Sequence, residues 1–288
     1  MGLQLLGSIP VLLMMAFAGV APAKDLVIER AMIHQIEDGP PIEAGYEFLP
    51  GETAWLSFRV AGFAVKEKDK DEEINSVQLH YTIRVTDPSG IPALQPFSGT
   101  MATDVRREDK DWVPKIRREI VLPEFAVRGK YTISLAVKDG ISGAEASKDV
   151  TLQVRNKEVA PSEELVARNF GFYRSEEARR PLTEVVYRVG ESIFVRMDVV
   201  GYVIQSPKNA FSVEYGLRLT GPDGKPVVDQ PVAATETFES FYPRRWLPIA
   251  FRLDLPSNGL KGEHQLTVQV RDKIAGKSLE IQKSFTVE

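Results

Sequence analysis

The residue types best suited to binding lie together in the last fifth of the sequence. The segment Phe238–Arg245 reads FESFYPRR and is followed directly by Trp246. Aromatic and arginine side chains dominate the energetics of protein interfaces, and an exposed aromatic ring can also stack on a sugar. We therefore predict a contact surface here, formed by Phe241, Tyr242, Arg244, Arg245 and Trp246.

One of these residues has a counterpart earlier in the chain. Trp112-Val113-Pro114 matches Trp246-Leu247-Pro248. A tryptophan that recurs at matching positions favours a packing role at one end of a hydrophobic core, with an aromatic platform for a partner or a sugar as the alternative. The sequence before Trp112 is charged, whereas the sequence before Trp246 is aromatic.

Signatures of catalysis are missing from the sequence. There is no cysteine, and the three histidines, His34, His80 and His264, are too widely separated to form a short metal-binding motif. No Gly-x-Ser-x-Gly elbow, phosphate-binding loop or dinucleotide-binding fingerprint is present. We therefore predict a protein that is not an enzyme and has no metal or cofactor. An enzyme with an unrecognised pair of carboxylates is the remaining alternative.

Two groups of acidic residues have side chains that could bind calcium. The run Lys66–Glu73 (KEKDKDEE) offers Asp69, Asp71, Glu72 and Glu73, but its interspersed lysines cancel their charge, so we predict a solvated loop. Asp139 and Asp272 recur at matching positions before glycine turns. Aspartates at such positions usually cap the turn through backbone N–H groups, with calcium binding as the alternative.

The composition sets the class of protein and its compartment. The chain carries 36 basic and 40 acidic residues, which gives no basic field for nucleic acid or an anionic membrane. Residues 1–23 hold no charged side chain and end in Ala21-Pro22-Ala23, the pattern of a cleaved secretory signal. We expect a periplasmic or extracellular protein that meets a membrane only through this segment, with an uncleaved anchor as the alternative.

The rest of the sequence is organised by an internal repeat. Landmarks of the first copy return in the same order and at a nearly constant spacing in the second, which indicates a duplication. The matched landmarks are Gly51-Glu52 with Gly190-Glu191, Tyr81 with Tyr215, Pro88-Ser89-Gly90 with Pro222-Asp223-Gly224, Leu122-Pro123 with Leu255-Pro256, Gly129 with Gly262, and Val137-Lys138-Asp139 with Val270-Arg271-Asp272.

Each copy carries the pattern of short β-strands. Val77–Val85 (VQLHYTIRV), Tyr131–Val137 and Leu266–Val270 alternate between apolar and polar residues, and turn-forming residues separate such segments. About seven strands per copy favour two tandem immunoglobulin-like β-sandwiches in an all-β chain, with a closed barrel as the alternative. We expect a signal peptide at 1–23, domains at 24–155 and 167–288, and a short linker at 156–166.

The second half of each copy resembles bacterial immunoglobulin-like and macroglobulin-like β-sandwich modules. The residues that carry the resemblance are Gly129-Lys130-Tyr131-Thr132-Ile133 through Asp139 and Gly262-Glu263-His264-Gln265-Leu266 through Asp272. The layout also resembles a two-domain pilus chaperone in size and domain count, although that family's paired cleft cations cannot be placed here. The resemblance implies a fold and an extracytoplasmic setting, and it implies no substrate.

These observations predict a non-catalytic binding or structural module of the bacterial cell envelope. It would engage a protein partner through sheet edges or end loops. Carbohydrate binding through the aromatic loop is the alternative, with a glycan as the partner.

Overall fold

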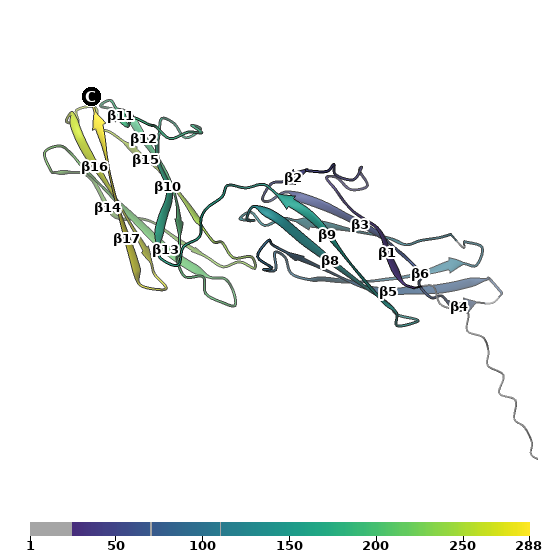
Figure 1. The fold of residues 1–288 in the computed structure, drawn as a ribbon. Helices are drawn as coiled ribbons and strands as arrows, with labels where there is room; N and C mark the ends of the chain where they lie inside the picture. The colour runs from purple at the N-terminus through teal and green to yellow at the C-terminus, as the bar shows by residue number, and fades with distance from the viewer. Residues whose placement is uncertain (1–24, 70, 110) are drawn as a thin grey trace, which may run out of the picture.

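The computed structural model describes residues 25–69, 71–109 and 111–288, and the secretory signal expected at 1–23 lies outside them (Figure 1). Every regular element in the described chain is a β-strand. No helix in this part of the chain is long and apolar enough to cross a membrane. Four sheets form two sandwich-like halves, one built from β1–β9 and the other from β10–β17.

The first half contains a three-stranded sheet with the order β1-β3-β7 and a six-stranded sheet. In the six-stranded sheet the order is β2-β9-β8-β5-β4, and β6 also pairs with β5. Its strands are β1 (Val27–His34), β2 (Glu47–Phe48), β3 (Thr53–Ala61), β4 (Lys66–Asp69), β5 (Ile74–Thr86), β6 (Phe97–Arg106), β7 (Lys115–Val121), β8 (Gly129–Asp139) and β9 (Glu145–Val154).

The second half repeats this order with β10-β12-β15 as one sheet and β11-β17-β16-β13-β14 as the other. Its strands are β10 (Val166–Tyr173), β11 (Val186–Tyr187), β12 (Ser192–Val200), β13 (Phe211–Thr220), β14 (Pro226–Phe238), β15 (Leu247–Asp254), β16 (Gly262–Asp272) and β17 (Lys277–Val287). In both halves the last strand pairs in parallel with a two-residue strand, β2 with β9 and β11 with β17.

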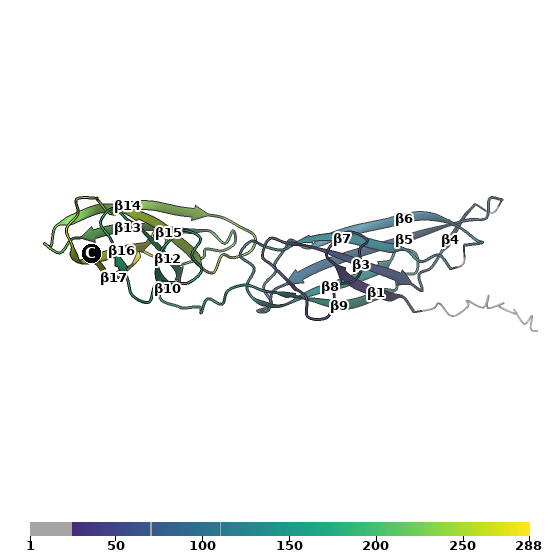
Figure 2. The same cartoon turned by 90° about the horizontal axis from the view of Figure 1, so that it is seen from above.

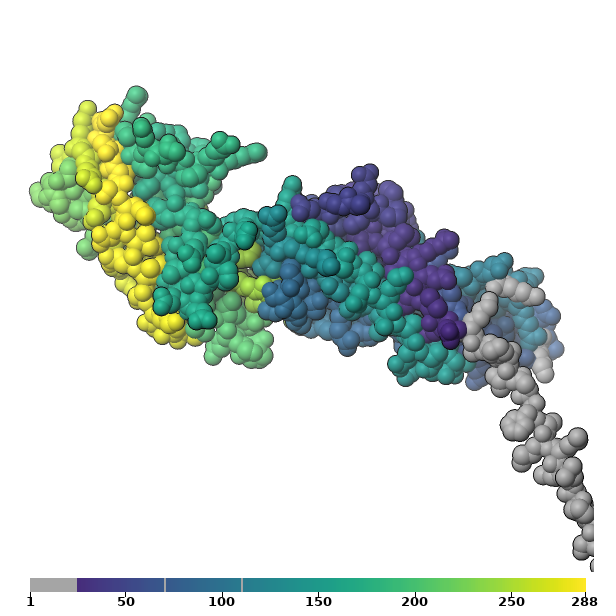
Figure 3. Space-filling view, viewed as in Figure 1, coloured from purple at the N-terminus to yellow at the C-terminus, as the bar shows by residue number. Residues whose placement is uncertain are grey.

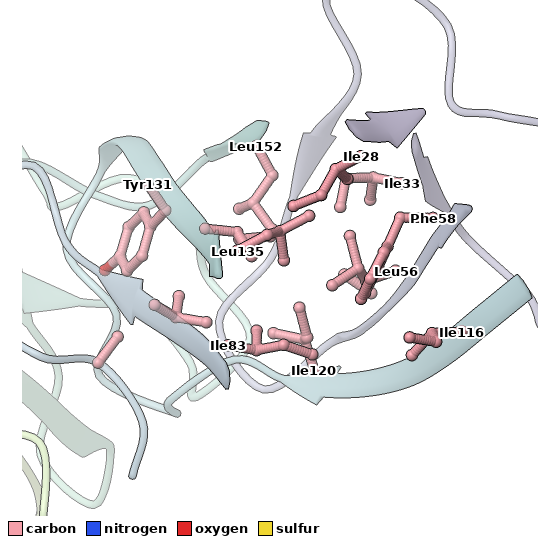
Figure 4. Packing of buried hydrophobic residues seen from close by; sticks show 14 of the residues in the cluster. Ile28, Ile33, Leu56, Phe58, Ile83, Ile116, Ile120, Tyr131, Leu135 and Leu152 are labelled. Atoms are coloured by element: carbon pink, nitrogen blue, oxygen red, sulfur yellow. The ribbon is translucent and has the colours of Figure 1, made fainter. Parts of the chain in front are cut away.

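The alternating pattern of the sequence places the core between the two sheets of each half. In β5, Val77, Leu79, Ile83 and Val85 are buried. Since successive side chains of a strand point to opposite faces, one face of each sheet is apolar and must pack against another layer. Figure 4 shows this packing in the first half, where Leu56 and Phe58 of β3 lie across the interior from Leu135 of β8.

One expectation about the first half is wrong in detail. The run Lys66–Glu73 was expected to be a loop, but Lys66–Asp69 form β4, which pairs with β5 between Ile74 and Ser76. All four residues of β4 are exposed, so backbone hydrogen bonds hold this strand without a buried face.

The two halves lie end to end, as Figures 2 and 3 show from different sides. The end of the first half that carries β2 and the end of β9 faces the second half (Figure 1). The equivalent end of the second half carries β11 and the chain's C-terminus and points away from the first half (Figure 1).

Candidate functional site

The predicted contact loop lies between β14 and β15, at the end of the second half that faces the first (Figure 1). Its backbone is fixed from within the second half. Asn209 donates from Nδ2 to the carbonyl oxygens of Ser240 (3.3 Å) and Phe241 (2.6 Å), and the Tyr202 hydroxyl donates to the carbonyl oxygen of Arg244. The loop is therefore held in one conformation when it meets the first half.

Asp87 of the first half is the main polar acceptor for this loop. Its carboxylate is fully buried, and Oδ1 accepts the backbone N–H groups of Ser89 (2.8 Å) and Ile91 (2.9 Å). Its Oδ2 accepts the Tyr242 hydroxyl at 3.0 Å and also the guanidinium of Arg245. A buried carboxylate is tolerated only when it is paired and hydrogen-bonded, and here half of its partners come from the other half of the chain.

Tyr242 extends the core of the first half. It is 6% exposed and belongs to the same hydrophobic cluster as the buried residues of β3, β5 and β8. Its hydroxyl lies 3.3 Å from the hydroxyl of Tyr131, and the Tyr131 hydroxyl donates to the carbonyl oxygen of Val127. Figure 4 shows the Tyr131 oxygen pointing away from the aliphatic cluster, toward the end of the sandwich. Burial raises the pKa of Tyr242, so this phenol stays protonated and able to donate.

A second set of contacts surrounds Phe125 of the first half. The ring of Trp246 meets Phe125 edge-on with centroids 5.9 Å apart, and the guanidinium of Arg244 lies 3.5 Å from the centre of the Phe125 ring. Burial lowers the pKa of Arg244. A partly buried arginine over an aromatic face contributes about 1 kcal/mol, so this contact adds to the attachment of the two halves.

The start of the connecting segment is also tied to both halves. Asn156 donates from Nδ2 to the carbonyl oxygen of Ala126 (2.7 Å) in the first half. Lys157 forms an ion pair with Asp198 of β12, and Asn169 donates to the other oxygen of Asp198 at 3.0 Å. We call the contacts of the loop and of this segment the joint.

The structure thus places four of the five predicted residues in the joint. Tyr242 and Trp246 are each 6% exposed and offer no open ring face for a sugar, whereas Phe241 is 40% exposed. Binding of an outside partner by these five residues stays a prediction. Trp112, the counterpart of Trp246, contacts Phe63 edge-on at 5.8 Å and packs against the core of the first half.

The joint involves residues of the first half that the sequence did not single out. Asp87 and Phe125 both lie in turns, and neither residue type at such a position indicates an interface by itself. A signal was nevertheless present in the repeat: the positions that match them in the second copy are Gly221 and Asn258, so neither residue is part of the shared scaffold.

Two groups of acidic residues could have bound calcium, the run Lys66–Glu73 and the pair Asp139 and Asp272. Among the described residues, no group of three or more acidic or histidine side chains could hold a metal ion. Asp139 and Asp272 are buried turn caps. Asp139 accepts the N–H groups of Ala64 (2.6 Å) and Ile141 (2.8 Å), and Asp272 accepts those of Val203 (2.8 Å) and Ile274 (2.9 Å). The turn-capping prediction is therefore confirmed.

The longest regular edge left open in the first half is that of β6. It pairs with β5 over ten residues, Phe97 to Arg106, without a register shift, and no other strand of the described chain pairs with it. Charged side chains occur only near its end, at Asp104 and Arg106, so its centre is neutral. An open edge presents unpaired backbone N–H and C=O groups, which are a template for another strand.

The equivalent strand of the second half, β14, is interrupted. Its pairing with β13 shifts register twice, and it contains Pro226 and Pro231. Bulges and prolines are the usual means by which proteins protect an edge from pairing. Both strands run along the upper margin of the molecule in Figure 2, so one side of the chain carries an open edge and a protected one.

Comparisons with known proteins identify no family. No family model matches the chain, and no curated protein matches it. Among solved structures, the C-terminal domain of the Streptococcus pyogenes antigen I/II-family protein AspA is similar with a TM-score of 0.30 and 10% identity, over 92% of this chain and 99% of that one. Pseudomonas fluorescens alkylpurine DNA glycosylase AlkC, bound to DNA with an abasic site analog, is similar with a TM-score of 0.29 and 13% identity, over 43% of this chain and 30% of that one. Likenesses at these scores carry no argument about function.

Proposed function

We propose that the chain is a non-catalytic, exported module of the bacterial cell envelope that binds an extended segment of a protein partner along β6. Its two halves would be immunoglobulin-like domains that arose by duplication, with the boundaries 24–155 and 167–288. The matching strand orders of the two halves support this interpretation.

The observation that carries the proposal is the unprotected edge of β6. In strand addition, backbone hydrogen bonds along an open edge supply affinity, and the alternating side chains supply specificity. The neutral centre of β6 suits this mode because charges or prolines would oppose pairing. The joint supports the proposal in a different way, since a fixed arrangement of the two halves presents the edge in a constant orientation.

The test is site-specific crosslinking in the native envelope. A photoreactive residue at Ala102, exposed at the centre of β6, is expected to capture an extended segment of one protein. The matched control is the same photoreactive residue at Gln265 of β16, which is exposed but lies between β13 and β17. The variant Thr100→Lys places a charge on the edge and should abolish capture at Ala102. Equal capture from both positions, or capture that persists in Thr100→Lys, would contradict the proposal.

A further inference from the structure

The far end of the second half has the same construction as the end of the first half that holds Tyr242. In the first half, the turn at this end is closed by hydrogen bonds from Asp87 N to the Ile91 oxygen and from Gly90 N to the Asp87 oxygen. The second half repeats both bonds, from Gly221 N to the Lys225 oxygen and from Gly224 N to the Gly221 oxygen.

The strand register extends this match to the residues that contact Tyr242. Tyr131 pairs with Leu152 across β8 and β9, and His264 pairs with Phe285 across β16 and β17. His264 therefore occupies the position of Tyr131, whose hydroxyl reaches Tyr242 in the joint.

At this far end there is an open hollow where the first half holds Tyr242. The hollow has a volume of about 210 Å³, and its apolar wall is formed by Leu255, Val287, Val227 and Leu260 together with the ring of His264. Asp223, Lys225 and Asn258 also line it. Leu260 is 53% exposed and Val227 is 39% exposed. Their counterparts in the first half are Val127, which is partly buried, and Ala93, which is 1% exposed. We call this hollow the end socket.

His264 offers the end socket a hydrogen-bond acceptor. The His264 ring stacks on Phe285 and is almost fully buried, and its Nδ1 lies 3.2 Å from the carbonyl oxygen of Gly262. A carbonyl can only accept, so Nδ1 carries the proton, and in a neutral ring Nε2 is then an acceptor. Within the described residues the ring makes no other hydrogen bond, so Nε2 can accept one from outside.

We propose that the end socket binds a loop of another protein that carries a tyrosine, which enters as Tyr242 enters the first half and donates its hydroxyl to Nε2 of His264. The partner's ring packs against the apolar wall formed by Leu255, Val227 and Leu260, and its hydroxyl donates to Nε2 of His264. This inference rests on the proposed function, because it names a second partner contact of the same binding module.

The chemistry of the two ends argues against a second copy of this chain as the occupant. The segment of the first half that matches Phe238–Arg245 contains Arg106, Arg107, Glu108, Asp109 and Asp111. This segment has no aromatic side chain, so it cannot fill the end socket as Tyr242 fills the end of the first half. The occupant is therefore a tyrosine loop from a different protein.

A defined probe tests the geometry. A cyclic peptide with the sequence of Phe238–Trp246 is added to the full chain, and binding is followed by NMR shifts of His264 and by calorimetry. The covalently attached loop already fills the end of the first half at a high effective concentration, so the peptide reports on the end socket. Replacing the peptide's tyrosine with alanine should weaken binding at least tenfold.

The matched variant is Leu260→Asp, which alters an exposed side chain and should leave the fold intact while abolishing peptide binding. Equal binding of the tyrosine and alanine peptides, no binding of either, or unchanged binding to Leu260→Asp would overturn the proposal.

The natural occupant is then identified by a photoreactive residue at Val227 in the envelope. A captured loop whose tyrosine is required for capture supports the proposal. Capture of a glycan, of this chain itself or of nothing overturns it. Capture at Ala102 should continue in Leu260→Asp, so failure at the end socket is distinguishable from failure of the proposed function.

Discussion

Removing the single hydroxyl of Tyr242 tests whether the joint is held by its buried polar contacts. In Tyr242→Phe the ring still fills the core of the first half, while the bond to Asp87 is lost. A hydrogen bond to a charged group contributes about 1.5–3 kcal/mol. Asp87 keeps Arg245 and its two backbone donors, so we expect a loss near the lower end, about 1.5–2 kcal/mol. This lowers the ratio of attached to separated halves by roughly 10- to 30-fold.

Two measurements read this loss. The chain has no cysteine, so spin labels can be attached to Ser147→Cys and Ser284→Cys alone, at exposed positions of the first and second halves. The distance distribution between these labels should be narrow in the parent chain and broader in Tyr242→Phe. Urea unfolding followed by tryptophan fluorescence gives the free energy, because Trp246 lies in the joint.

A matched control and a double-mutant cycle sharpen the test. Tyr215 is partly buried in the second half, and its hydroxyl makes no hydrogen bond among the described residues, so Tyr215→Phe should change stability little. The loss from Tyr242→Phe should shrink in an Asp87→Asn background, because the charged acceptor is already gone. An equal loss in both backgrounds, within about 0.5 kcal/mol, would refute the reasoning.

Three further predictions test how the halves are built. Asp139→Asn should cost about 1–3 kcal/mol at neutral pH. Burial opposes ionisation of Asp139, but the hydrogen bonds from backbone N–H groups outweigh burial and lower the pKa of Asp139. The stability that Asp139 contributes is therefore present above pH ~4 and is lost as the pH falls further. Thermal melts of the parent chain and of Asp139→Asn should converge in acid. Gly201→Ala should cost about 3 kcal/mol or more, since Gly201 has φ +80° and an added Cβ would lie 1.9 Å from the Glu164 carbonyl oxygen. The control Gly224→Ala has a similar φ of +78° but open space around the added Cβ, so it should cost about 1–2 kcal/mol. Urea unfolding measures both losses. Burial raises the pKa of Tyr187 to about 12, so its contribution is intact below pH ~10 and lost as the pH rises toward 12, and Tyr187→Phe should flatten the alkaline part of the melting profile.

The strands were predictable wherever one face is buried. The alternation in Val77–Val85 falls within β5, and that in Tyr131–Val137 falls within β8. Period-two alternation encodes a strand with one apolar face, so these segments carry their own structural signal. β4 carries no such signal, because its residues are all exposed and charged and it has no buried face.

The location of the contact loop was predictable, but its partner was not. Tyr242, Arg245 and Trp246 have the composition of an interface, and an interface within a chain uses the same residue types as one between chains. Composition alone therefore cannot tell the two apart. The choice was decided by Asp87 and Phe125, which lie far away in the sequence and become neighbours of the loop only when the two halves are placed end to end.

The two equivalent ends separate what the fold requires from what the contact requires. The turn at Asp87 and the turn at Gly221 close with the same pair of backbone hydrogen bonds, so the aspartate is not needed to form the turn. A buried carboxylate is costly by itself, and Asp87 is tolerated because Tyr242 and Arg245 supply donors. At the far end Gly221 stands in that position, and the carboxylate that lines the end socket, Asp223, already accepts the N–H of Lys225 and pairs with its ammonium group. A tyrosine hydroxyl would instead find His264. The end socket therefore favours a neutral aromatic donor. The comparison of the tyrosine and alanine peptides tests the need for the aromatic donor, and Leu260→Asp tests the place where it binds.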